Sequence, residues 1–180
     1  MQKMLLAAGL ALLWPLAISA QESPKAELFG GYSYLRADAG GEGVNLNGWN
    51  ASIAVNPNRW FGLVADFSGH YGSPFDVDTS VHSFLFGPRV SYRKHGTVTP
   101  FAHALFGATH IKVTTNVAGA KLTESDTAFA LALGGGIDVK LRPSVALRLI
   151  QADYLLTRFG EETQNNVRLS TGFVFRWGNR

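Results

Sequence analysis

Apolar and polar side chains alternate along residues 167–177, near the carboxy terminus. The odd positions are mainly apolar and end in the aromatic residues Phe173, Phe175 and Trp177. The even positions are mainly polar and include Arg168. A period of two places the two sets on opposite faces of a β-strand. A tilted strand of about 9–11 residues can cross a bilayer, so we predict a strand whose aromatic face contacts lipid.

A similar alternation recurs upstream. Trp49 and Ile53 alternate with small polar residues in one segment, and Phe61 and Phe67 do so in the next. Each segment has the length of a membrane-crossing strand of about 9–11 residues or slightly more. We predict eight strands, at residues 26–36, 44–56, 60–71, 80–93, 99–112, 127–140, 144–159 and 167–177.

The fourth and fifth predicted strands are less regular. Pro88 lies inside the fourth and predicts a bulge or a missing ladder hydrogen bond, because proline has no backbone N–H. In the fifth, Phe101 and His103 share one face. Phe106 and His110 share the other, and the pattern leaves open which face is inside.

The seventh predicted strand contains a change of phase. Its polar residues Arg148 and Gln151 lie at positions of opposite parity. Both can face the same side only if one strand residue is left unpaired, as in a β-bulge. We therefore predict a bulge near Ile150.

The links between these strands alternate between long and short. Bacterial outer-membrane barrels have short periplasmic turns and longer external loops. The pattern therefore predicts an all-β fold, an eight-stranded antiparallel up-and-down transmembrane β-barrel with both ends in the periplasm. The predicted external loops are residues 37–43, 72–79, 113–125 and 160–166.

The composition agrees with a lipid-facing surface. Only 16% of residues are charged, whereas 12% are aromatic and 20 residues are glycine. The net charge of +3 is too small to favour nucleic acid as a partner. The chain has no cysteine, which excludes a disulfide framework.

The first 20 residues have the features of a secretory signal peptide. Lys3 precedes an apolar run at residues 4–18, and small residues follow up to Ala20. An uncleaved anchor is the alternative, but the run is short for a membrane-spanning helix of about 20 residues. We expect cleavage after Ala20, which leaves residues 21–180 as one barrel domain.

The face opposite the lipid side carries charged residues. An eight-stranded barrel is only wide enough for side chains to fill it, and buried charges must pair. We expect Arg148 to pair with Asp66 or Asp138, either as a plug or as a gate that opens when partners exchange; the narrow lumen favours the plug. The predicted lumen ion network is Glu27, Asp66, Arg89, Asp138, Arg148 and Arg168, with Asp153 as a further candidate.

No catalytic, metal or cofactor site is predicted. The histidines lack the spacing of a metal motif such as His-Glu-x-x-His. His82 and Ser83 invite comparison with a serine hydrolase pair, but adjacent strand residues point to opposite faces. We therefore expect no enzyme, and an outer-membrane enzyme that acts on lipid is the least favoured reading.

Several segments resemble a known family. They are residues 27–34 (ELFGGYSY), 86–92 (FGPRVSY), 100–103 (PFAH) and 169–178 (LSTGFVFRWG). With them the chain resembles the outer membrane protein beta-barrel domain family, and the eight-stranded barrel domain of outer-membrane protein A. The resemblance covers residues 21–180 and is specific for architecture, not for activity.

The resemblance implies a place in the bacterial outer membrane, and we expect a monomer there. Its expected partners are outer-membrane lipid and lipopolysaccharide, and the barrel-assembly machinery during biogenesis. The expected role is structural or interactive, with a narrow porin-like conductance as a further expectation. The alternative is a soluble periplasmic barrel that binds a small apolar ligand, as lipocalins do, with apolar residues inside and charges outside.

Overall fold

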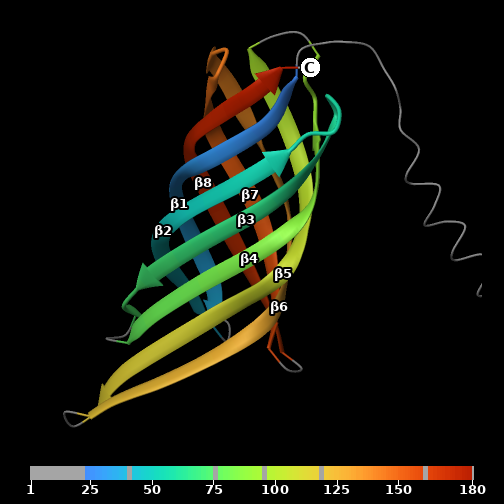
Figure 1. The fold of residues 1–180 in the computed structure, drawn as a ribbon. Coiled ribbons are helices and arrows are strands. Elements are labelled where there is room, and N and C mark those ends of the chain that lie inside the picture. Colours follow the sequence, from blue (N-terminus) through green and yellow to red (C-terminus); the bar gives the residue numbers. More distant parts are fainter. Residues whose placement is uncertain are drawn as a thin grey trace, which may run out of the picture.

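The computed structural model describes residues 23–39, 42–74, 77–94, 97–117, 120–159 and 162–179. The predicted signal peptide at residues 1–20 lies outside them. Eight antiparallel strands form a closed barrel in which β1 pairs with both β2 and β8 (Figure 1). This is the predicted fold class. The strands are β1 Pro24–Ala39, β2 Glu42–Val55, β3 Phe61–Gly72, β4 Asp78–Ser91, β5 Val98–Val117, β6 Ala120–Arg142, β7 Val145–Phe159 and β8 Glu162–Asn179.

The alternation in the sequence matches the two faces of the barrel wall. On β8, Phe173 and Trp177 are each 51% exposed on the outside. Arg168 and Val174 are fully buried in the lumen. The charged residues therefore lie inside and the large apolar residues outside, the reverse of a soluble barrel. The lipocalin-like alternative required the opposite arrangement and is not favoured.

The two strands with irregular patterns are now defined. On β5, Phe101 and His103 are buried in the lumen and Phe106 is exposed on the outside. On β7, the ladders to both neighbouring strands shift after Arg148, and Gln151 returns to the lumen. The predicted bulge near Ile150 is confirmed.

Pro88 interrupts the ladder on one side of β4. It lies opposite Leu63 on β3, where the register is continuous. Towards β5 the paired positions pass from Phe86 to Arg89, and neither Gly87 nor Pro88 is paired. The missing-bond alternative of the prediction therefore holds, and the register does not shift.

The prediction of a long external link at residues 113–125 is wrong. β5 and β6 continue through it as a paired hairpin that extends beyond the other strands, at the end of the barrel opposite the carboxy terminus (Figure 1). Thr and Val are abundant there, and β-branched side chains favour strands even when the segment is polar. The predicted links at 37–43 and 160–166 are likewise mostly strand. The alternation of long and short links is therefore wrong, because the extra length is in the strands.

The two ends of the barrel differ. We call the end with the β5–β6 hairpin the loop end. The other, with the start of β1, the end of β8 and the β2–β3, β4–β5 and β6–β7 turns, is the terminal end (Figure 1).

Candidate functional site

The predicted lumen residues all face the interior and are almost completely buried. They belong to six different strands, so the closure of the barrel, and not local sequence, brings them together. The structure separates them into two clusters, one at the terminal end and one in the centre. The exposed fraction is at most 3% for Glu27, Asp66, Arg89, Asp138, Arg148 and Arg168.

The terminal-end cluster contains Glu27 of β1 and several arginines around it. Arg89 of β4 reaches across the lumen and donates a hydrogen bond to Glu27. Arg93, in the turn after β4, lies 3.1 Å from the other carboxylate oxygen (Nη2 to Oε1). Arg176 of β8 approaches the same oxygen at 3.4 Å (Nε to Oε1). One carboxylate thus faces three guanidinium groups.

Arg148 of β7 completes this cluster. Its Nε donates to Asp138 Oδ1 at 2.8 Å and its Nη2 to Oδ2 at 3.3 Å, the two-pronged geometry that suits arginine and carboxylate. The guanidinium also lies between two rings, with its carbon 4.2 Å from the centroid of Phe29 and 4.4 Å from that of Phe101. Gly136 makes room for this arrangement, because a Cβ there would lie 2.8 Å from the Phe101 ring.

The central cluster is built around Arg168. Its Nη1 donates to Asp66 Oδ1 at 2.8 Å, and its Nη2 to Asp153 Oδ2 at 2.7 Å. Asp66 lies on β3 and Asp153 on β7, so this side chain spans the lumen. His103 bonds the second oxygen of Asp153 at 2.7 Å. Gln151 accepts from Arg148 and donates to Asp153, and so links the two clusters.

Sequence reasoning identified some of these residues and missed others. Asp153 was a candidate, and its partner Arg168 was in the predicted network. Arg93 was left out of the predicted network, although the predicted strand 80–93 gave it the phase of Arg89; in the structure β4 ends at Ser91 and Arg93 acts from the turn that follows. Arg176 could have been found from its position, since it shares the phase of Arg168. His103 shares the phase of Phe101, but the pattern of that strand left open which face is inside.

Apolar side chains close the lumen towards the loop end, which the sequence reasoning did not anticipate. The signal was available, because these residues have the inward phase of their strands. We define the apolar mouth as Leu35, Leu46, Val81 and Leu155, each at most 4% exposed and all in one hydrophobic cluster.

Ser33, hydrogen-bonded to Ser170 and His70 at 2.9 Å each, is a further buried polar group of the lumen.

The outer surface has an apolar band with aromatic residues towards both ends. Towards the loop end, tyrosine hydroxyls bond polar groups on the outside, as Tyr34 does with Asn45 at 2.7 Å and Tyr154 with Asn165 at 2.7 Å. Towards the terminal end, the rings of Trp60 and Tyr92 lie 5.3 Å apart. Aromatic side chains with one polar end are typical of membrane–water interfaces.

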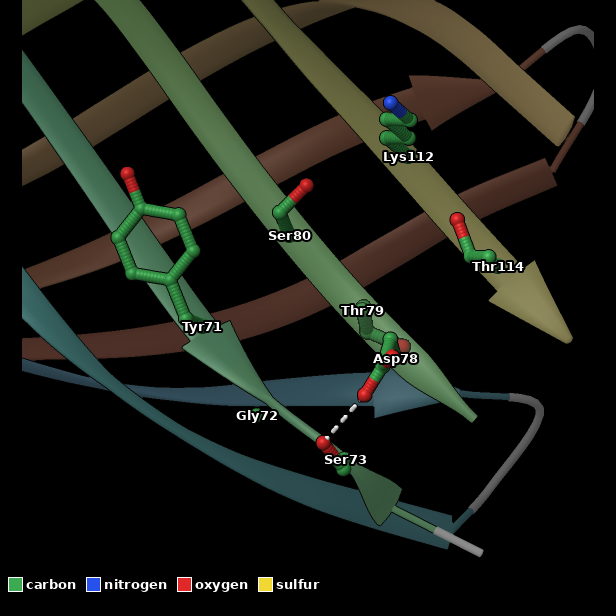
Figure 2. Close-up of a pocket in the computed structure, with 8 residues that line it drawn as sticks. All are labelled: Tyr71, Gly72, Ser73, Asp78, Thr79, Ser80, Lys112 and Thr114. Carbon is green, nitrogen blue, oxygen red and sulfur yellow. Dashed lines mark hydrogen bonds between the residues drawn. The ribbon is translucent and has the colours of Figure 1, made fainter. Parts of the chain in front are cut away.

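A hollow of about 410 Å³ lies on this outer surface, at the loop end of β3, β4 and β5. Figure 2 shows Tyr71, Ser80 and Lys112 beside one another on three adjacent strands, in register with one another. Asp78 accepts a hydrogen bond from Ser73 at 2.7 Å at its edge (Figure 2). On the loop-end side of the apolar band, this hollow therefore presents hydroxyl groups and the ammonium group of Lys112.

The arrangement offers no catalytic pair at His82 and Ser83. His82 bonds the Tyr71 hydroxyl on the outside at 3.0 Å. Ser83 bonds Thr109 inside the lumen at 2.9 Å. Among the described residues, no group of His, Asp and Glu side chains is arranged to hold a metal ion. No helix in that part of the chain is long and apolar enough to span a membrane.

An exposed apolar band around a lumen of paired charges defines a transmembrane β-barrel. The chain belongs to the outer membrane protein beta-barrel domain family, whose sequence model matches residues 4–176. No curated protein sequence matches it.

Solved outer-membrane barrels share the fold. The attachment invasion locus protein Ail of Yersinia pestis is 21% identical with a TM-score of 0.64, over 85% of this chain and 99% of that one. Neisserial surface protein A is 15% identical with a TM-score of 0.66, over 87% and 99%. The amino-terminal barrel of Pseudomonas aeruginosa OprF is 15% identical with a TM-score of 0.52, over 86% and 100%. At these identities the likeness concerns the fold alone.

Proposed function

We propose that this protein is a structural and interaction protein of the bacterial outer membrane, with a closed lumen, no enzymatic activity and no cofactor. The observation that carries the proposal is the Arg168 bridge between Asp66 and Asp153, which crosses the lumen. To open a pathway through the lumen, this bridge would have to break and the packed side chains of the apolar mouth would have to move apart. Loss of one partner from a buried ion pair costs about 3–5 kcal/mol, so an open state would be rare.

The β5–β6 hairpin is the best candidate for a contact surface. β6 pairs with β7 only from Phe129 onward, whereas it pairs with β5 from Ala120. The edge of β6 before Phe129 therefore offers backbone groups to which an extended partner segment could add as a strand. This supports an interaction role outside the membrane.

The outer hollow supports contact with the lipid of the outer leaflet. Lys112 and the hydroxyl groups of Tyr71 and Ser80 suit the phosphates and sugars of lipopolysaccharide, while the apolar band below suits its acyl chains. The continuous ladder around the barrel leaves no open edge within the band, which favours a monomer. Export through a cleaved signal peptide, and insertion by the barrel-assembly machinery, complete the proposal.

A narrow conductance is the second candidate, and one observation favours it. Asp138 lies 2.8 Å from Arg148 and 3.7 Å from Arg176, so that two arginines are available to one carboxylate. An exchange between them is the kind of movement by which a gate would work.

Planar bilayer recording separates the two candidates. We expect no resolved channel openings from the purified wild-type barrel. In membrane fractionation the same protein should be recovered in the outer membrane, and on a gel the unboiled sample should migrate faster than the boiled one. Regular openings of the wild type, lost when Asp138→Asn removes the shared carboxylate, would replace the closed-lumen proposal with the conductance. Recovery as a soluble periplasmic protein would overturn both.

A further inference from the structure

The terminal-end cluster contains more positive than negative charge. Among the described residues, Arg89, Arg93, Arg148 and Arg176 surround the carboxylates of Glu27 and Asp138. Four guanidinium groups and two carboxylates carry a net charge of +2. The central cluster contains two carboxylates, Asp66 and Asp153, and one arginine, Arg168, so its net charge is −1. Even if this charge is subtracted from the +2, a net charge of +1 remains.

Several nitrogen atoms of this cluster also lack hydrogen-bond partners. They are Nε of Arg89, Nε of Arg93, and Nε and Nη2 of Arg176, all buried and without a hydrogen bond among the described residues. The two Arg176 atoms make only longer ion-pair contacts, at 3.4 Å to Glu27 and 3.7 Å to Asp138. A buried donor without a partner costs free energy, and more so when it is charged. The excess charge and these donors lie on the same side chains, and both would be compensated by an anion.

We propose that the terminal-end cluster is a binding site for a small oxyanion of the phosphate class. Guanidinium groups present planar forks of N–H donors that match the oxygens of phosphate. The proposal goes beyond the structural and interaction role above and does not depend on it.

The position of the arginines allows an anion to enter from the terminal end. The side chains of Arg93 and Arg176 remain 10% and 9% exposed, more than the 3% of Arg89 deeper in the lumen. Arg93 lies in the turn after β4, outside the strands, and burial lowers the pKa of its guanidinium. Arg93 and Arg176 are therefore the side chains through which the site contacts its surroundings.

Glu27 fixes the arrangement but does not complete it. Its two oxygens are already used by Arg89 and Arg93, with Arg176 close to the second. Asp138 is engaged on both oxygens by Arg148. Arg176 Nε and Nη2 lie 3.4 Å from Glu27 Oε1 and 3.7 Å from Asp138 Oδ2 but make no hydrogen bond to either oxygen. A ligand from outside the chain would supply the missing acceptor.

The test is a thermal unfolding series on the purified barrel in neutral detergent at constant ionic strength, with sodium phosphate replacing sodium chloride. We expect phosphate to raise the wild-type midpoint by about 2–4 °C or more at saturation. Arg93→Gln should abolish this rise, and Arg93→Lys should reduce it. The matched control is Arg142→Gln, an exposed arginine at the same end of the barrel, which should respond as the wild type does.

A second series separates the source of the oxyanion. The barrel is placed in neutral phosphatidylcholine vesicles, with or without phosphatidic acid, and without free phosphate. A response to inorganic phosphate identifies a soluble ligand, whereas a response to phosphatidic acid alone identifies a lipid headgroup; both must be lost in Arg93→Gln. An equal response in Arg93→Gln and the wild type, or no response to either source, would overturn the proposal.

Discussion

The two ends of the lumen are closed by different chemistry. At the loop end, apolar side chains of the mouth pack against one another and need no compensating charge. In the centre and at the terminal end, closure depends on ion pairs between arginines and carboxylates of other strands. The difference shows that the lumen of a barrel of this size can be closed by apolar packing or by ion pairs, and that a substitution destabilises the two in different ways. Loss of an apolar side chain leaves a gap, whereas loss of an ionic partner leaves an uncompensated charge.

The largest effect is expected from Arg168→Ala. It removes the only guanidinium that contacts both Asp66 and Asp153 among the described residues, and leaves two buried carboxylates near each other. We expect the free energy of unfolding, measured by urea titration in vesicles, to fall by about 3–5 kcal/mol. Asp66→Asn in the same background should restore part of the loss. No restoration would contradict the pairing.

Arg148→Ala should have a smaller effect. Asp138 loses its two-pronged partner and the contact with two rings is lost, but Arg176 remains 3.7 Å from the carboxylate. We expect a loss of about 3 kcal/mol in the same titration, with a lower melting temperature. An unchanged melting temperature would exclude a stabilising pair. Arg142→Ala, at an exposed position, serves as the matched control and should change stability by less than about 0.5 kcal/mol.

Leu35→Ala tests the apolar mouth. The side chain is 2% exposed and belongs to the mouth cluster, so its truncation should cost about 2–3 kcal/mol through lost burial and an unfilled cavity. In contrast to the arginine variants, the loss should not change with salt concentration. A strong salt dependence would mean that the two ends of the lumen do not differ as described. The exposed Leu141 provides a control, since Leu141→Ala leaves no cavity.

Ser33→Ala should have the smallest effect. Ser33 is fully buried and bonds Ser170 and His70 by its hydroxyl group. We expect a loss of about 1 kcal/mol. If Ser33→Ala lowered the free energy of unfolding as much as Arg168→Ala does, the hydrogen bonds of Ser33 would contribute more to stability than their distances indicate.

The sequence predicted the faces of the strands but not the partners across the lumen. Alternation alone placed Arg168 inside and Phe173 outside, and the change of phase near Ile150 located the bulge. The partner of Arg168 is different in kind, because Asp66 lies on a strand far away in sequence and meets it only when the barrel closes with a particular stagger.

The candidate site shows the same limit. Arg93 shares the inward phase of Arg89, but its contact with Glu27 is made from the turn after β4 to a carboxylate of β1, and the sequence does not show that partner. The β5–β6 hairpin was missed for another reason, since polar composition suggested a loop while Thr114 and Thr123 pair within the extended sheet. The β-branched residues of this segment favour a strand whereas its polar composition suggests a loop, and the cross-strand pairs stabilise the strand.

The closed lumen is tested most directly by the reactivity of one introduced thiol. The chain has no cysteine, so Ser33→Cys carries a single thiol in the buried lumen, and Ser125→Cys carries one on the exposed part of the hairpin. The measurement is the rate of modification of the folded barrel by a small water-soluble methanethiosulfonate. We predict rapid modification at position 125 and modification at position 33 only after unfolding. Equal rates at both positions in the folded barrel would show a water-filled lumen and contradict the account.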